Sequence, residues 1–122
     1  MNIVFYGDIE TITNNNTCYR KVISTTTYMQ LVIMSILPKE EIGMEKHEYV
    51  TQFIRIESGI GKAIINNIKY LLKDGIALVI PPNTWHNIIN TSKTESLKLY
   101  SIYSPPEHPI KTVQKYKPSE DD

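Results

Sequence analysis

The stretch GIALVIPPNTWHNIIN, residues 75–90, decides the fold. It holds two short apolar runs, 76–80 and 85–89, on either side of a Pro-Pro pair. Apolar, β-branched runs of this length bounded by Gly, Pro and Asn are typical of β-strands. The second run carries His86 close to its beginning, so a strand in this position would present an imidazole next to the turn.

Similar runs recur on both sides of this stretch. We expect strands over 28–37, 52–56, 62–65, 68–72 and 97–103, in addition to 76–80 and 85–89. Asn66-Asn67 predicts a two-residue hairpin turn, and Glu57 to Gly61 predicts a glycine-bearing hairpin turn. No stretch of a dozen residues has a convincing helical period. Short strands spaced in this way predict an all-β sandwich or barrel, and a closed barrel removes exposed sheet edges.

Length and composition limit the classes of protein that need to be considered. A chain of 122 residues suits one domain, and 13 basic residues balance 13 acidic ones. A net charge of zero gives no electrostatic basis for binding nucleic acid or an anionic membrane. The 11 lysines against 2 arginines are typical of an AT-rich genome, microbial or viral.

The N-terminal sequence and the cysteine content bear on where the protein is located. Residues 1–12 do not resemble a signal peptide, and no apolar run approaches the roughly 20 residues that span a bilayer. The single cysteine, Cys18, cannot form a bridge within the chain, and we expect it to have a packing or surface role. We therefore expect a soluble cytoplasmic protein.

Two separated segments carry the residue types that bind metals. Glu45 and His47 lie two apart, so on a strand both side chains project from one face. Gln52 joins them if the chain turns between His47 and Gln52. His86 supplies one further imidazole from a distant strand.

These two segments resemble the two motifs of the cupin family. The second motif is Gly-x5-Pro-x-Gly-x2-His-x3-Asn, and Gly75, Pro81, His86 and Asn90 match it in residue and spacing. The first motif has His-x-His, then a glutamate, then a glycine after six more residues, and the gap from Gln52 to Gly59 matches. The resemblance covers about residues 19–115 and extends to small cupins labelled mannose-6-phosphate-isomerase-like. It implies an antiparallel double-stranded β-helix, the jelly-roll barrel.

The chain departs from the family motifs at three positions. Glu45 stands where the family has its first histidine, Gln52 where it has its glutamate, and Asn83 where it has a glycine. Asparagine tolerates a left-handed turn, so Asn83 is expected to preserve the turn. The ligand set that the resemblance implies is Glu45, His47, Gln52 and His86. Two histidines and a carboxylate suit iron, manganese, zinc or nickel, but an amide oxygen is a weak ligand.

Two functions remain open at this stage. The first is a metal-dependent enzyme that acts on a small molecule. The second is a non-enzymatic binding or structural module that has lost its metal, with the same polar residues lining a ligand cavity. The resemblance also suggests a homodimer in which the N-terminal arm, residues 1–18, packs on a partner subunit through a strand within 1–12. Residues 110–122 are expected to be a polar tail.

Further residues near the motifs are given mainly structural roles. Trp85 is expected in the barrel wall, with a ligand platform as the alternative. Arg55 is expected to point outward or to pair with an acid, with a clamp for a substrate anion as the alternative. Tyr100 and Tyr103 are expected to pack on the last long strand. His108, next to Glu107, is expected to be structural or to lie at a dimer surface, with a position in the cavity as the less favoured alternative. The sequence leaves the roles of Arg55, Tyr103 and His108 open.

Overall fold

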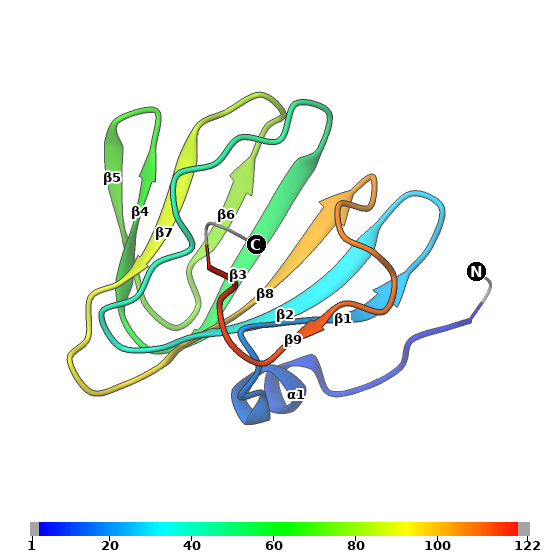
Figure 1. Cartoon of the computed structure of the whole chain (residues 1–122), viewed down its shortest axis with the longest axis horizontal. Coiled ribbons are helices and arrows are strands. Elements are labelled where there is room, and N and C mark those ends of the chain that lie inside the picture. Colours follow the sequence, from blue (N-terminus) through cyan, green and yellow to red (C-terminus); the bar gives the residue numbers. More distant parts are fainter. Residues whose placement is uncertain (1–2, 120–122) are drawn as a thin grey trace.

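Two antiparallel β-sheets form a barrel in the computed structural model, which describes residues 3–119 (Figure 1). The six-stranded sheet has the order β6-β3-β8-β2-β1-β9 and the three-stranded sheet the order β5-β4-β7. The strands are β1 (Arg20–Thr25), β2 (Gln30–Ile36), β3 (Thr51–Ser58), β4 (Gly61–Ile65), β5 (Ile68–Leu72), β6 (Ala77–Ile80), β7 (His86–Asn90), β8 (Leu97–Ser104) and β9 (Val113–Gln114). The prediction of an all-β, jelly-roll double-stranded β-helix is confirmed.

The core lies between the two sheets. Strands β3 and β8 alternate between buried and half-exposed residues, as expected when one face of a sheet packs inward. Their inward residues include Ile54, Ile56 and Leu99, each 0% exposed. Ala63 and Ile88 face them from the three-stranded sheet and belong to the same apolar cluster. The described residues thus bury a continuous core without a disulfide.

The sequence located most strands to within two residues but misjudged one turn. Asn66 and Asn67 both have positive φ, as the predicted two-residue hairpin requires. The predicted hairpin at 57–61 is wrong, because β3 pairs with β6 and β8 whereas β4 pairs with β5 and β7. This segment crosses from one sheet to the other. Gly59 has φ +94, and a Cβ there would lie 2.6 Å from the Ser96 carbonyl oxygen, so the crossing requires glycine.

Three elements lay outside the strand predictions. Strands β1 and β9 pair with each other at the edge of the larger sheet, so part of the expected polar tail is ordered sheet. Helix α1 (Ile9–Asn15) has Asp8 as its N-cap, whose carboxylate accepts a hydrogen bond from the Thr11 backbone N–H. At seven residues it is too short to show a period in a dozen-residue window. No helix among residues 3–119 is long and apolar enough to cross a membrane.

The N-terminal segment differs from the expected strand within the single chain. Residues 9–12 lie in α1, and residues 3–8 pair with no strand of the described structure. Met1 and Asn2, part of the same expectation, lie outside the described residues. Packing of this arm on a partner subunit stays a prediction.

The connection between β2 and β3 positions the site. It runs beside β7, with isolated bridges between Glu41 and Ile89 and between Glu45 and His86 (Figure 1). The Asn87 side chain fixes the same connection, since its Oδ1 accepts from the Gly43 N–H and its Nδ2 donates to Glu41 Oε1. A segment without regular strand geometry is therefore tied to the barrel wall.

Candidate metal centre

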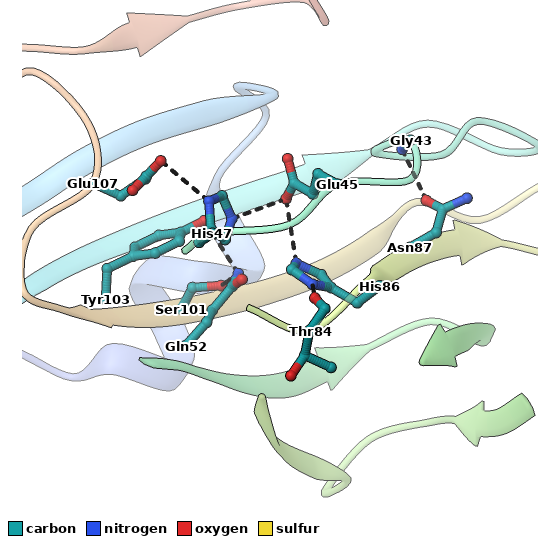
Figure 2. A network of polar contacts seen from close by, with 10 residues as sticks. All are labelled: Gly43, Glu45, His47, Gln52, Thr84, His86, Asn87, Ser101, Tyr103 and Glu107. Carbon is teal, nitrogen blue, oxygen red and sulfur yellow. Dashed lines mark hydrogen bonds and ion pairs between the residues drawn. The ribbon is translucent and has the colours of Figure 1, made fainter. Parts of the chain in front are cut away.

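Glu45 and His86 lie opposite each other in an antiparallel bridge. Each backbone N–H donates to the other residue's carbonyl oxygen, and both distances are 2.9 Å. Directly opposed residues in an antiparallel pair project from the same face, so the carboxylate and the imidazole point together into the mouth of the barrel. Figure 2 shows both side chains converging from the two segments.

His47 is held by the turn of the second motif. The Asn83 N–H donates to the His47 carbonyl oxygen at 2.7 Å. Asn83 has φ +61, so the prediction that asparagine preserves the left-handed turn of the motif glycine is confirmed. The turn before β7 therefore fixes both histidines, one directly in the strand and the other through this hydrogen bond.

The side chains of Glu45, His47 and His86 meet at one point. One donor atom from each residue lies within 4.8 Å of the others. Glu45 Oε1 is 3.3 Å from His47 Nε2 and 3.5 Å from His86 Nε2. With metal–ligand bonds of about 2.0–2.2 Å, neighbouring ligands around one ion lie roughly 3.0–3.6 Å apart. The spacing of these atoms therefore fits a single metal ion.

The other ring nitrogen of each histidine has an oxygen partner. His47 Nδ1 is 3.1 Å from Glu107 Oε1, and His86 Nδ1 is 2.8 Å from the Thr84 carbonyl oxygen (Figure 2). A carbonyl oxygen only accepts, so the proton of neutral His86 lies on Nδ1 and its Nε2 lone pair is free. Oxygen acceptors that fix the tautomer in this way are typical of metal-bound histidines.

Both Nε2 atoms are buried and lie at ion-pair distance from Glu45 Oε1, but within residues 3–119 neither has a contact with hydrogen-bond geometry. Buried nitrogen atoms without partners destabilise a fold, because their lost hydration is not replaced. A metal ion bound to both lone pairs would remove this penalty. The donor set therefore fits the divalent ion that the sequence suggested.

The charge of Glu45 is maintained despite its burial. Burial raises the pKa of Glu45, but the short contacts with His47 and His86 and their positive charge outweigh it and lower the pKa to about 2. The short contact with Glu45 raises the pKa of His47, and Glu107 raises it further. In the metal-free site, the carboxylate thus favours a protonated His47.

Gln52, the fourth predicted ligand, lies on β3 below His47 (Figure 2). It is 2% exposed, and its amide nitrogen donates to Ser101 Oγ at 3.3 Å and to Tyr103 Oη at 3.1 Å. Its amide oxygen is buried without a hydrogen-bond partner in the described structure. Its role as a metal ligand stays a prediction.

The sequence underestimated the loop after β8. Glu107 reaches His47, and His108 packs edge-on against Tyr103 with ring centroids 5.1 Å apart. Burial lowers the pKa of His108 to about 4. His108 thus belongs to the lining of the mouth, which was the less favoured alternative in the sequence analysis. No spacing rule connects this loop to the motifs, so the sequence carries no signal for these contacts.

The buried side chain of Gln30 holds the loop that contains Glu107 and His108. Its side chain is 0% exposed, and its Oε1 accepts from the backbone N–H groups of Glu107 and His108 at 3.2 and 2.9 Å. Its Nε2 donates to the His108 carbonyl oxygen at 2.7 Å. One amide therefore satisfies three backbone groups of the loop that orients His47.

The remaining residues lie as follows. Arg55 faces outward on β3 and pairs with Glu57 at 3.5 Å, as expected. Tyr103 is 2% exposed and forms the floor beneath His47, whereas Tyr100 lies on the outer face beside Phe53. Trp85 is 52% exposed, with the Lys46 ammonium 5.1 Å from its ring centroid. It lies outside the triad.

Two curated proteins are similar in sequence over most of this chain. It is 43% identical over 120 residues to the uncharacterized protein L612 of Acanthamoeba polyphaga mimivirus, covering 96% of this chain and 75% of that protein. It is 42% identical over 119 residues to the uncharacterized protein YrkC of Bacillus subtilis. That match covers 93% of this chain but only 63% of YrkC.

A solved structure and a family model agree with these relatives. The crystal structure of BH2720 from Bacillus halodurans has a TM-score of 0.92 and 38% identity, covering 95% of this chain and 92% of that chain. The model of the cupin domain matches residues 32–103, which include the triad, the predicted fourth ligand and Asn90. Both the motif spacing and the barrel are accounted for by this match, and the chain belongs to the cupin family.

Proposed function

We propose that this protein binds a divalent transition metal ion through Glu45, His47 and His86 and uses it to bind a small molecule in the mouth of the barrel. The observation that carries the proposal is the convergence of two buried Nε2 atoms, neither with a hydrogen bond of good geometry, on one carboxylate oxygen. Iron, manganese, zinc and nickel all accept two imidazoles and a carboxylate.

The protein's own groups would perform three tasks. The Thr84 carbonyl oxygen and the Glu107 carboxylate accept hydrogen bonds from the Nδ1–H groups, so both imidazoles present lone pairs at Nε2. Glu45 remains ionised and supplies the negative charge that a divalent ion needs. Three protein ligands leave positions for a substrate oxygen, on which the bound ion would act as a Lewis acid.

Elemental analysis of the protein purified without a histidine tag tests the proposal. We expect about one equivalent of a transition metal, lost in His86→Asn. The matched control is His108→Asn, which replaces a half-buried histidine of the same mouth outside the triad. Its metal content is expected to equal that of the wild type.

A thermal measurement provides an independent readout. An ion that binds only the folded protein raises the melting temperature. Chelation is therefore expected to lower it in the wild type and in His108→Asn but not in His86→Asn. Metal-free protein whose melting temperature does not change on adding any of the four ions would contradict the proposal and favour the non-enzymatic module.

We also propose a homodimer. Among the described residues of the arm, Ile3, Val4 and Tyr6 are 84%, 86% and 98% exposed. Adjacent apolar residues with such exposure are typical of a protein interface. Light scattering at micromolar concentration is expected to give twice the chain mass, and deletion of residues 1–7 is expected to give the monomer mass.

A further inference from the structure

Buried polar atoms without partners gather at the mouth of the barrel. Eight such side-chain atoms occur within residues 3–119, and five of them belong to residues in or near the mouth: Arg20, His47, Gln52, His86 and His108. A metal ion satisfies lone pairs, as on the histidines. The Nε–H of Arg20 is a donor and cannot bind a cation, so it requires an acceptor that the metal does not supply.

Arg20 is fixed on β1 with its guanidinium already oriented. Its Nη1 donates to Gln114 Oε1 at 2.8 Å, and the guanidinium carbon lies 5.1 Å from the centroid of the Tyr19 ring. These two contacts hold the plane of the group. A guanidinium held in one orientation loses little entropy on binding a carboxylate.

Arg20 and Glu45 line the same cavity, which has a volume of about 360 Å³. The other lining residues come from the connection between β2 and β3, from Tyr19 and from the C-terminal segment: Glu41, Ile42, Gly43, Met44, Lys117 and Pro118. The charges of Arg20 and Glu45 also act in opposite directions on the pKa values of Tyr103 and His108, as expected for groups around one mouth. The cavity therefore connects the guanidinium to Glu45, one member of the triad.

The C-terminal segment closes one side of this cavity. The Tyr19 N–H donates to the Lys115 carbonyl oxygen, and the Lys117 ammonium donates to the Glu41 carbonyl oxygen at 2.7 Å. Lys117 is thus held at the rim as a second positive charge. The segment crosses in front of the barrel in Figure 1.

We propose that this cavity, here called the Arg20 cavity, binds a small carboxylic acid whose carboxylate accepts hydrogen bonds from Arg20 while its other end points toward Glu45. The position of that other end rests on the proposed metal function, whereas the contact with Arg20 does not. Arg20 is the binding residue for the ligand, and among residues 3–119 it forms no hydrogen bond or ion pair with a predicted metal ligand.

The charges of the cavity favour a carboxylate over a phosphate ester. Glu41 and Glu45 line it together with Arg20 and Lys117, so two negative charges face two positive ones. A phosphate monoester brings nearly two negative charges at neutral pH, and the carboxylates would repel it. A monocarboxylate brings only one negative charge and can form two parallel hydrogen bonds with the Arg20 guanidinium.

Calorimetric titration with two probes that share a shape but differ in charge tests this proposal. Glutaramate carries one carboxylate, and glutaramide has the same shape without the charge. We expect glutaramate to bind the wild type, and Arg20→Gln to weaken it at least about tenfold, as for the loss of hydrogen bonds to a charged group. Glutaramide is expected to bind both proteins equally weakly. Acetate and pyruvate serve as further carboxylates.

Arg55→Gln is the matched control, because Arg55 is the other arginine of the chain and pairs with Glu57 on the outer face. It is expected to bind glutaramate like the wild type. Arg20→Lys keeps the charge without the planar fork and is expected to be intermediate. Circular dichroism establishes that each variant is folded, and Arg20→Lys carries the test if Arg20→Gln is not.

Titrations in metal-free and metal-loaded protein separate this proposal from the proposed function. Arg20-dependent binding of a carboxylate in protein that takes up no metal would support the Arg20 cavity and reject the metal centre. Normal metal content with no Arg20-dependent binding of any of the three carboxylates, up to the millimolar range, would overturn the cavity proposal alone. Arg20-dependent binding of inorganic phosphate that is tighter than that of every carboxylate would overturn the chemical class.

Discussion

His47 lies between two carboxylates, with Nε2 3.3 Å from Glu45 and Nδ1 3.1 Å from Glu107. The two contacts have different consequences. Glu107 accepts a hydrogen bond from the Nδ1–H that neutral imidazole retains, whereas Glu45 faces the nitrogen whose lone pair would bind a metal. With carboxylates on both sides, His47 readily holds a second proton when no metal is bound, and a bound metal ion would displace that proton from Nε2.

Replacement of Glu107 is expected to weaken the metal centre without removing a ligand. Glu107→Ala leaves the His47 Nδ1 proton without its carboxylate, so the ring loses its fixed orientation. Loss of such an outer partner typically reduces metal affinity about 10- to 100-fold. Competition with a chromogenic chelator measures the change. Glu48→Ala, an exposed glutamate beside His47, is the control, and an equal loss there would contradict the role of Glu107.

Replacement of Gln30 is expected to act on the same imidazole from further away. Gln30→Ala removes the amide that binds three backbone groups of residues 107–108. Leaving buried groups unpaired costs about 1–3 kcal/mol, which urea denaturation measures as a lower free energy of unfolding.

The metal affinity of Gln30→Ala is also expected to fall, because the loop no longer holds Glu107 in place. The double variant Gln30→Ala/Glu107→Ala is expected to lose no more affinity than Glu107→Ala alone, since both changes remove one effect. Additive losses would show that Gln30 acts independently of Glu107.

The stabilisation by metal is expected to depend on pH. Glu45 raises the pKa of His47 above its ordinary 6.5, and a metal ion must displace the proton from Nε2. The increase in melting temperature on adding the ion should therefore be small near pH 5 and larger near pH 8. A shift independent of pH would contradict binding through His47.

In the metal-free protein, the contribution of His47 and Glu45 to the free energy of unfolding is expected to fall, not rise, as pH increases above about 6.5. The raised pKa of His47 gives stability that is complete below pH 6.5 and lost as pH rises through the folded-state value. The lowered pKa of Glu45, about 2 against 4.5, gives stability present above pH 4.5 and lost as pH falls toward 2. The pair thus contributes most between about pH 4.5 and 6.5.

The variant His108→Asn allows the pH-dependent contribution of Glu45 and His47 to be measured separately. The pKa of His108 is lowered to about 4, so the folded protein loses stability from this residue as pH falls below 6.5. Denaturation curves of His108→Asn, with and without Glu45→Gln, remove that contribution. Their difference in unfolding free energy is expected to be largest between pH 4.5 and 6.5.

The sequence predicted those parts of the molecule that depend on local patterns. Short apolar runs predicted most of the strands, and the spacing of the two motifs predicted Glu45, His47 and His86 as candidate metal ligands. The contacts of Gln30, Glu107 and Arg20 were not predictable in this way. They join residues 77, 60 and 94 positions apart through side chains, and no periodicity records such pairings. The crossing at Gly59 was misjudged because a turn sequence does not reveal which sheet the next strand enters.

The turn at Asn83 gives the last prediction. Asn83 adopts φ +61 where the family motif has glycine, and its N–H holds the His47 carbonyl oxygen. Asn83→Ala is expected to cost about 1–2 kcal/mol of unfolding free energy, because an alanine Cβ is disfavoured in the left-handed region. Asn83→Gly keeps this conformation accessible and is expected to retain the metal affinity of the wild type. Equal stability of the alanine and glycine variants in urea denaturation would show that the turn relaxes, and His47 would then move with it.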